Sequence, residues 1–375
     1  MRQWFSAVAL VALVPATAGA ETLADAVAAA YTNNPTLQAA RAQARATDET
    51  LPQARSGYLP RIDLSGSYGV RRVDQVTPSP TTTVTDIEPK QYGVNASQEL
   101  FTGFRRSNEV KRANATIDAT LEQLRSTEQT ILLQTISAYV DVRRDEAVVT
   151  IRANNVEVLM RQLEEARARF EVGDITRTDV AQAEARLAGA QSQLSAARSD
   201  LAATRARYAQ IIGNAPGTLE APPPPPDLPD TLEAAVDMAQ QANPDYLSFK
   251  GAERAAKAQI GVDRSELLPQ VALTGSLARS FDQTLPNIET ESATAAAQLS
   301  IPLYEGGLLR SRVRQSKEQY TRAQAQSEAA RRSVVSQVTA AWNALDAARQ
   351  VIASSQEQEK ANELALEGAR EEFGV

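Results

Sequence analysis

The residue types that usually carry out chemistry are scarce in this 375-residue chain, which contains neither cysteine nor histidine. Thiol nucleophiles, disulfides, Cys/His zinc sites and histidine proton shuttles are therefore excluded. The sequence also lacks a Gly-rich phosphate loop and a Gly-x-Ser-x-Gly nucleophile elbow. What remains is a set of ordinary carboxylates on charged, helix-like segments. We therefore expect no enzyme activity, no metal site and no cofactor.

The composition favours long, thin elements over a thick globular core. Hydrophobic residues make up 43% of the chain but aromatic residues only 5%, so large side chains are few. Alanine-rich helices that pack closely through small side chains fit these values. The formal net charge of −7 argues against a nucleic acid as partner.

The N-terminus has the pattern of a secretory signal peptide, predicted over residues 1–20. Arg2 supplies the positive charge, an apolar run follows, and Ala18-Gly19-Ala20 is a small-residue cleavage pattern that would leave Glu21 first. The apolar run is shorter than the roughly 20 residues of a membrane-spanning helix. Without a cysteine to acylate, a lipoprotein is also excluded.

The chain repeats itself once. Thr22-Leu23, Asn34-Pro35 and Leu59-Pro60 recur 209 residues later, and Leu100-Phe101 recurs as Leu303-Tyr304 after 203 residues. The difference falls near residues 73–89, which are rich in Thr and Pro and are expected to form a longer exposed loop. We predict a first repeat over residues 21–213, a Pro-rich linker over 214–230 and a second repeat over 231–375.

Each repeat is expected to open with a helix and continue with two strands. The helices, residues 22–56 and 231–265, begin at Thr N-caps, are interrupted at Asn-Pro and end before Leu-Pro. The strand-like runs alternate apolar with small or polar residues over about 10 positions, as in transmembrane β-barrels. We expect Ile62, Leu64, Leu273 and Leu299 to face lipid, and Ser65, Thr274 and Gln298 to face the lumen.

Very long helices follow the strands. Residues 103–170 contain no proline and no internal glycine after Gly103, which predicts a helix of roughly 100 Å. After a turn at Gly173-Asp174, a second helix reaches about residue 212 with a heptad seam typical of a coiled coil. Its two core positions are Val180, Leu187, Leu194, Leu201 and Tyr208, and Ala183, Ala190, Ala197, Thr204 and Ile211.

Four strands cannot close a membrane barrel, since the smallest bacterial barrels have about eight. Open strand edges do not occur in lipid. Either a second kind of chain supplies further strands or the protein is a closed oligomer.

These features resemble the TolC family of outer-membrane efflux proteins. The resemblance rests on the repeated layout and on several motifs: the two Leu-Pro stops, the Leu-Phe-x-Gly turn at Leu100, the Leu-Tyr-x-Gly-Gly turn at Leu303, and Arg169-Phe170-Glu171-Val172-Gly173 followed by Thr178-Asp179-Val180. It covers essentially all of residues 21–375.

The resemblance implies a mixed α and β fold, with four transmembrane strands per chain contributing to a twelve-stranded barrel of a homotrimer. A long periplasmic coiled-coil tunnel of α-helices would continue from it. The implied site is the cell outer membrane, in contact with its lipid, and the implied partners are a periplasmic adaptor and an inner-membrane transporter. The implied function is a passive duct for efflux of small molecules, type I protein secretion, or both.

The resemblance also assigns a candidate periplasmic gate at the helical hairpin, made of Gly173, Thr178 and Asp179. Thr178 and Asp179 match positions of the latch network in the family. Asp179 could equally be an exposed carboxylate at a helix start, favoured by the helix dipole. Both interpretations remain open from the sequence.

The repeat aligns residues 372–375 with residues 169–172, so a returning helix of about 40 residues is expected to be missing from the second repeat. We expect the entrance constriction to lie in that segment. Trp342, Leu345, Val351 and Ile352 should then be partly uncovered, which would make the chain labile to proteases beyond about Arg331 and prevent it from closing a tunnel.

The alternative function is a periplasmic coiled-coil adaptor of an efflux system. An adaptor would need a lipoyl-like motif and one hairpin, whereas here both repeats begin with membrane-type strands. An enzyme is the second alternative, supported only by generic carboxylates.

Overall fold

The computed structural model describes residues 20–76, 82–224, 228–283 and 287–373. Nearly all of the predicted signal peptide lies outside these residues. These described residues form two compact units, a helical unit within Met1–Ala40 and Thr127–Asp227 and a sheet unit within Arg41–Ser126 and Leu228–Val375. The sheet unit combines parts of both sequence repeats, because strands from both repeats join in one sheet.

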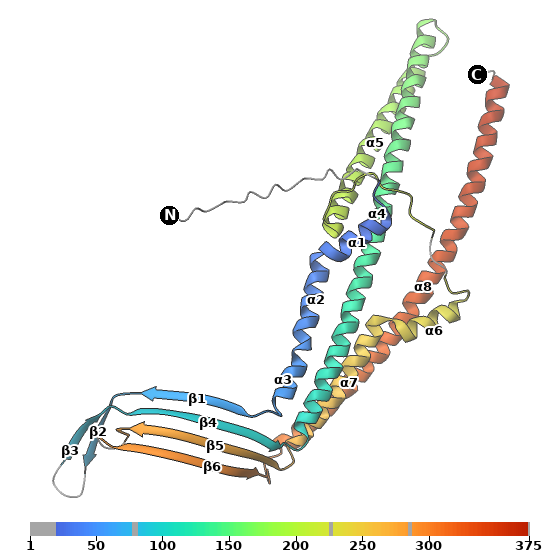
Figure 1. Ribbon diagram of the computed structural model, residues 1–375. Coiled ribbons are helices and arrows are strands. Elements are labelled where there is room, and N and C mark those ends of the chain that lie inside the picture. The colour runs from blue at the N-terminus through green and yellow to red at the C-terminus, as the bar shows by residue number, and fades with distance from the viewer. Residues whose placement is uncertain (1–19, 77–81, 225–227, 284–286, 374–375) are drawn as a thin grey trace, which may run out of the picture. The chain divides into compact units, whose positions relative to one another are not determined.

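The helical unit is built from α1 (Leu23–Asn33), the second part of α4 (Arg105–Glu171) and α5 (Arg177–Ile212), with α4 and α5 forming a hairpin (Figure 1). Its core joins Ala26 and Ala30 of α1, Tyr139 and Val142 of α4, and Ile212 of α5. The predicted seam of α5 is confirmed at the positions that are buried: Ala190, Leu194, Ala197, Tyr208 and Ile211.

The first helix of each repeat starts and breaks where the sequence predicts. Thr22 Oγ1 accepts from the Asp25 amide at 3.1 Å, and the Asp25 carboxylate accepts from the Thr22 amide at 3.2 Å, which makes a capping box. Asn34 separates α1 from α2 (Pro35–Asp48) in extended conformation, as expected before proline. Its buried amide group donates to the Ile211 carbonyl at 2.8 Å. Asn-Pro is thus both a helix break and a tertiary contact.

One four-stranded sheet organises the sheet unit. Its strands lie in the order β1 (Arg61–Tyr68), β4 (Lys90–Phe101), β5 (Gln270–Phe281) and β6 (Glu289–Ser300), and all neighbours are antiparallel. Figure 1 shows the four strands as one curved layer. In the described part of the chain, β1 and β6 each have a single strand neighbour, so the sheet has two open edges.

The expectation of a long loop over residues 73–89 is wrong. β2 (Arg71–Val76) and β3 (Thr82–Ile87) pair as an antiparallel two-stranded ribbon, with Arg71 opposite Ile87 and Val76 opposite Thr82. A two-stranded ribbon hydrogen-bonds through its backbone and does not need an apolar face. The Thr- and Pro-rich composition therefore gave no strand signal.

The helices of the sheet unit are α3 (Thr50–Ser56), α6 (Leu232–Ala242), α7 (Pro244–Ser265), α8 (Leu308–Phe373) and the first part of α4. α7 and α6 both pack against α8. α7 also approaches α4 closely, since a Cβ on Gly251 would lie 2.8 Å from the backbone of Ala119. None of the described helices combines the length and the apolar character needed to cross a membrane.

Candidate functional site

The register of the sheet sorts its side chains into two faces. Leu64 pairs with Val94, Val94 with Leu277, and Leu277 with Ala293. Side chains of directly paired residues project to the same side of a sheet. One face, here called the apolar face, therefore carries an unbroken row across all four strands.

The four residues predicted to face lipid all belong to the apolar face. Ile62 precedes Leu64 by one alternation, Leu273 pairs with Ala297, and Leu299 pairs with Val271. The three residues predicted to face the lumen lie on the opposite face, each directly across from a glycine or an alanine: Ser65 opposite Gly93, Thr274 opposite Ala296, and Gln298 opposite Ala272. The structure thus separates the two predicted sets onto opposite faces of the sheet; what each face contacts stays a prediction.

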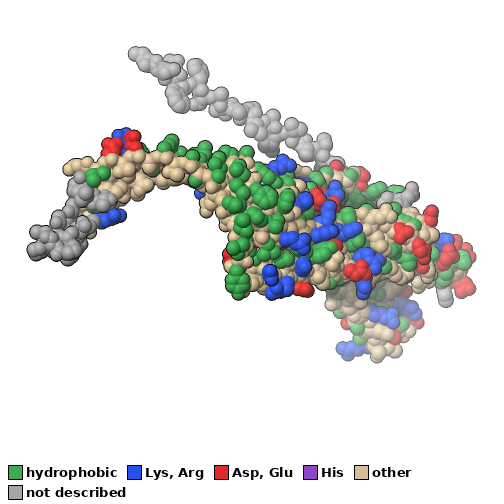
Figure 2. Space-filling view, turned by 90° about the horizontal axis from the view of Figure 1, so that it is seen from below, with side chains coloured by type: hydrophobic (Ala, Val, Ile, Leu, Met, Phe, Trp, Pro, Cys, Tyr) green, Lys and Arg blue, Asp and Glu red, His purple; other side chains and the backbone are tan. Residues whose placement is uncertain are grey.

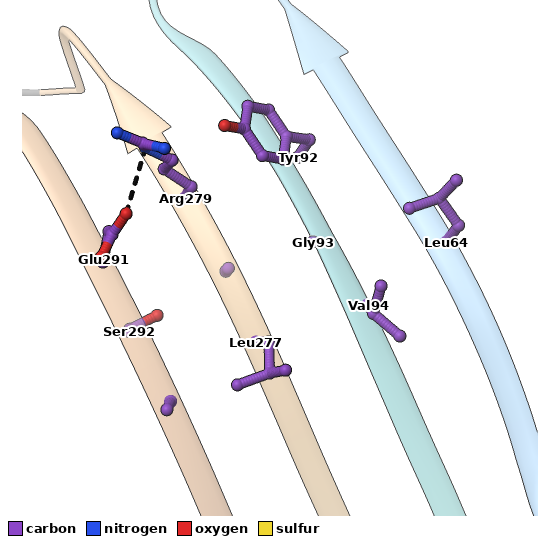
Figure 3. A pocket seen from close by; sticks show the side chains of 10 residues that line it. Leu64, Tyr92, Gly93, Val94, Leu277, Arg279, Glu291 and Ser292 are labelled. Atoms are coloured by element: carbon purple, nitrogen blue, oxygen red, sulfur yellow. Dashed lines mark ion pairs between the residues drawn. The ribbon is translucent and has the colours of Figure 1, made fainter.

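Charged residues mark one end of the apolar face. A hollow on this face is lined by Leu64, Tyr92, Leu277 and Arg279, among others (Figure 3). Arg279 forms an ion pair with Glu291, from Nε to Oε1 at 3.3 Å, and a second ion pair with Glu289. These groups lie beside the β5–β6 connection, at the end of the strands away from the long helices (Figure 1).

The turn of the α4–α5 hairpin is closed by its own backbone. Gly173 has φ of +83°, and the amide of Asp174 donates to the Arg169 carbonyl at 2.9 Å. This pattern is the glycine-dependent C-cap of a helix. Arg169 Nε also lies 2.7 Å from the Asp174 carboxylate. Gly173 thus has a conformational reason for its position.

Asp179 is used locally. Its Oδ2 accepts from the backbone amide and from the hydroxyl of Thr176, both at 2.8 Å, so that Thr176 and Asp179 form the capping box of α5. The backbone and side-chain hydrogen bonds from Thr176 lower the pKa of the Asp179 carboxyl. Thr178 lies exposed on the first turn. The structure brings the three predicted gate residues into one tip but gives Asp179 a capping role.

A polar cluster inside the helical unit was not predicted. The fully buried Tyr208 donates from its hydroxyl to Glu21 Oε1 at 2.6 Å, and the fully buried Tyr139 hydroxyl lies 2.8 Å from the carbonyls of Glu21 and Glu220. Burial, and then the Glu21 carboxylate, raise the pKa of Tyr208. In the sequence Tyr208 occupied a heptad position and read as an apolar seam residue, while its partner lies 187 residues away.

These arrangements provide surfaces rather than a reaction centre. Within the described ranges, no group of three or more acidic side chains could hold a metal ion. The features that the fold does assemble are an apolar sheet face, a polar sheet face and an exposed hairpin tip. All three suit a protein that sits in a membrane and meets partners through helices.

Comparison with known proteins also points to a membrane protein. The family model described as "Outer membrane efflux protein" matches residues 26–214 and 235–375. The outer membrane efflux protein BepC of Brucella suis is 34% identical over 357 residues, which cover 95% of this chain and 76% of BepC. The outer membrane protein TolC of Vibrio cholerae is 28% identical over 368 residues, covering 95% of this chain and 82% of TolC.

A solved structure has the same fold. The outer membrane protein VceC from Vibrio cholerae superposes with a TM-score of 0.76 at 17% identity, over 94% of this chain and 86% of VceC. The relatives are channel proteins, and the alternative of a periplasmic adaptor is not favoured. The chain therefore belongs to the outer membrane efflux protein family, as an outer-membrane channel of the TolC type with its helices in the periplasm.

Proposed function

We propose that this chain is one of three identical subunits of a passive export duct. The three sheets form one barrel of twelve strands, and the helices continue it as a periplasmic tunnel. Cargo enters from an inner-membrane transporter through a periplasmic adaptor and leaves at the cell surface. The cargo classes that fit such a duct are small molecules, secreted polypeptides, or both.

The observation that carries this proposal is the pair of open edges on a sheet with one apolar face. Unpaired backbone groups of an edge strand cannot be satisfied in lipid. β1 and β6 run in opposite directions, because three antiparallel steps separate them. β6 of one copy can therefore pair with β1 of the next in the same antiparallel manner, which closes the ring without any other chain.

The two faces fit this assembly. The apolar face, with Leu64, Leu277 and Leu299 all more than half exposed, would meet lipid. The opposite face, with Ser65, Thr274 and Gln298, would line a water-filled passage. Ser65, Thr274 and Gln298 are uncharged, whereas the charged Asp63 of β1 lies on the same face, two residues from Ser65.

The hairpin tip is the proposed contact with the adaptor. Val172 is 80% exposed, and Thr178 is exposed as well. Gly173 and Asp179 hold the shape of the tip through the turn and the capping box. In this proposal Asp179 acts on the partner by keeping the α5 start folded, since its carboxylate is already occupied by Thr176.

Disulfide trapping between edge strands tests the assembly. The natural chain has no cysteine, so introduced pairs are the only thiols. Ile62→Cys on β1 is combined in turn with Ala293→Cys, Ala295→Cys or Ala297→Cys on β6, and the membrane-embedded protein is oxidised. At least one pair should give a covalent trimer on a denaturing gel, because each copy bonds to both neighbours.

The matched control is Val94→Cys with Leu277→Cys, which pair across β4 and β5 of one chain. This pair should form a disulfide within a monomer. A covalent ladder that stops at two copies, or that runs beyond three, would overturn the trimer. Monomers from every edge pair beside an oxidised control would overturn the edge-to-edge closure.

A further inference from the structure

The buried polar cluster of the helical unit has no part in the proposed duct. The duct uses the hairpin tip and the sheet, at whose helix end Figure 2 shows hydrophobic side chains gathered. Tyr139 and Tyr208 are both 0% exposed, and a buried hydroxyl is costly unless it finds a partner. The partner that both hydroxyls share is Glu21, the residue predicted to come first after signal-peptide cleavage.

The backbone of Glu21 pairs with the segment that follows α5. Its nitrogen donates to the Thr218 carbonyl at 2.8 Å, and its carbonyl accepts from the Glu220 amide at 3.1 Å. These two bonds form a one-residue parallel bridge in which Leu219 lies opposite Glu21. Ala20, the preceding residue, is exposed and lies outside the bridge. The tertiary contacts thus start one residue after the predicted cleavage point.

The side chain of Glu21 is held together with its carbonyl. Oε1 accepts from the Tyr208 hydroxyl at 2.6 Å, and the Tyr139 hydroxyl lies 2.8 Å from the Glu21 carbonyl. The two tyrosines belong to different helices, α4 and α5. Glu21 is therefore fixed at its nitrogen, its carbonyl and its carboxylate, and it cannot be drawn out as extended chain unless all of these contacts break.

The charges around Glu21 suit a positive group on its nitrogen. Glu21 directly precedes the N-cap of α1, and a helix N-terminus on its own disfavours a cation. Two carboxylates offset this effect: that of Glu21 itself, and that of Asp25, which accepts from the Thr22 hydroxyl at 2.6 Å. The Thr218 carbonyl already accepts from the Glu21 nitrogen, and an α-ammonium would make that hydrogen bond charge-assisted and stronger.

A signal peptidase would create this ammonium by hydrolysing the peptide bond between Ala20 and Glu21. The reaction consumes one water molecule, leaves the new carboxylate on Ala20 and leaves the new α-ammonium on Glu21. The exposure of Ala20 keeps this bond reachable, while the bridge starts just beyond it.

We propose that the helical unit contains a binding site for the processed N-terminus, here called the N-terminal clamp, which shields this end of the chain from aminopeptidases. The clamp consists of Tyr139, Tyr208, Thr218 and Glu220. An aminopeptidase has to take the terminal residue into its own active site, and the clamp occupies the groups of Glu21 that the enzyme needs. The proposal rests on the predicted signal peptide and is independent of the duct.

A lengthened terminus tests the clamp without altering it. Two alanines are inserted between Ala20 and Glu21 of the full chain, and the exported protein is purified in detergent and incubated with a broad-specificity aminopeptidase. Intact mass should show trimming down to Glu21. Glu21 itself should then be lost at least about tenfold more slowly than from a free peptide of two alanines and residues 21–28, because the clamp must open before cleavage.

Three results would contradict the clamp. Trimming could run past Glu21 at the rate of the free peptide, or it could stop before it reaches Glu21. The exported natural chain could also have a mass that places its first residue elsewhere than Glu21.

Tyr208→Phe tests the side-chain contact of the clamp. This variant leaves the terminal sequence unchanged, so the aminopeptidase meets the same residues, and Glu21 should be lost several-fold faster than from the natural chain. Tyr31→Phe is the matched control, because Tyr31 also donates to a glutamate, Glu128, at 3.0 Å. Circular dichroism and native-gel mobility of both variants are compared first. Equal acceleration in both variants, or none in Tyr208→Phe, would overturn the role of Tyr208 in the clamp.

Discussion

Gly251 offers a quantitative test of how closely α7 and α4 pack. A Cβ at this position would lie 2.8 Å from the N, Cα and Cβ atoms of Ala119. These atoms belong to the neighbouring helix, two of them to its backbone, so no side chain can rotate away to relieve the contact. α7 would have to shift by more than half an ångström to restore an ordinary contact of about 3.5 Å.

Two effects of opposite sign decide the outcome for Gly251→Ala. Alanine is favoured over glycine in a helix interior by about 1 kcal/mol. Overpacking a tight contact costs about 1–3 kcal/mol. Gly189→Ala is the matched control, because Gly189 lies inside α5 with no atom within 4 Å of an added Cβ. Gly189→Ala therefore gains the higher helix propensity of alanine without creating a steric clash.

We expect Gly189→Ala to raise the free energy of unfolding and Gly251→Ala to leave it unchanged or lower it, with a gap between them of about 1–3 kcal/mol. The measurement is urea unfolding in detergent, followed by far-UV circular dichroism at unchanged m value. If both variants are stabilised equally, α7 and α4 are not in contact at Gly251, and the packing described for the sheet unit is wrong.

Three further outcomes are expected. Leu273→Arg should cost about 2–4 kcal/mol if it lies near the membrane midplane and reduce the yield of assembled protein on native gels, whereas Thr274→Arg on the opposite face should assemble normally. Tyr208→Phe removes a buried hydrogen bond to the Glu21 carboxylate and should lower the free energy of unfolding by about 1.5–3 kcal/mol. Because burial raises the pKa of Tyr208, the natural chain should lose stability as the pH rises above about 10. The Tyr208→Phe variant should lose less stability over the same pH range. Two neighbouring arginines lower the pKa of Glu328 from 4.5 to about 2, so its contribution to folding stability is lost as the pH falls through that window. In an acid titration followed by circular dichroism, Glu328→Gln should lack this pH-dependent loss of stability.

Features that repeat along the chain could be predicted from the sequence. Strand alternation assigned Leu64, Leu273 and Thr274 to their sides of the sheet, because a period of two is the same in the sequence and in the pleat. The N-caps at Thr22 and Thr231 depend on neighbours three residues away and were also correct. Local and periodic signals are visible without knowing the fold.

Contacts between distant segments could not be predicted. Tyr208, which donates to the Glu21 carboxylate, looked like an apolar seam residue, because nothing near it in the sequence reveals that partner. At the hairpin tip, the sequence predicted the turn at Gly173 but not the partner of Asp179. The sequence left two interpretations of Asp179 open, a latch residue and an exposed carboxylate at a helix start. In the structure Asp179 forms the capping box of α5 with Thr176, and Thr178 takes no part in it.

The even number of strands in the sheet has a consequence for stoichiometry. Because β1 and β6 run in opposite directions, any number of copies could join edge to edge without a mismatch of strand direction. Strand direction therefore does not fix the number of copies. That number has to be set by the curvature of the sheet together with the packing of the helices. A close contact such as Gly251 against Ala119 then influences how many subunits fit in a ring, and substitutions there could produce rings of another size that still insert into a membrane.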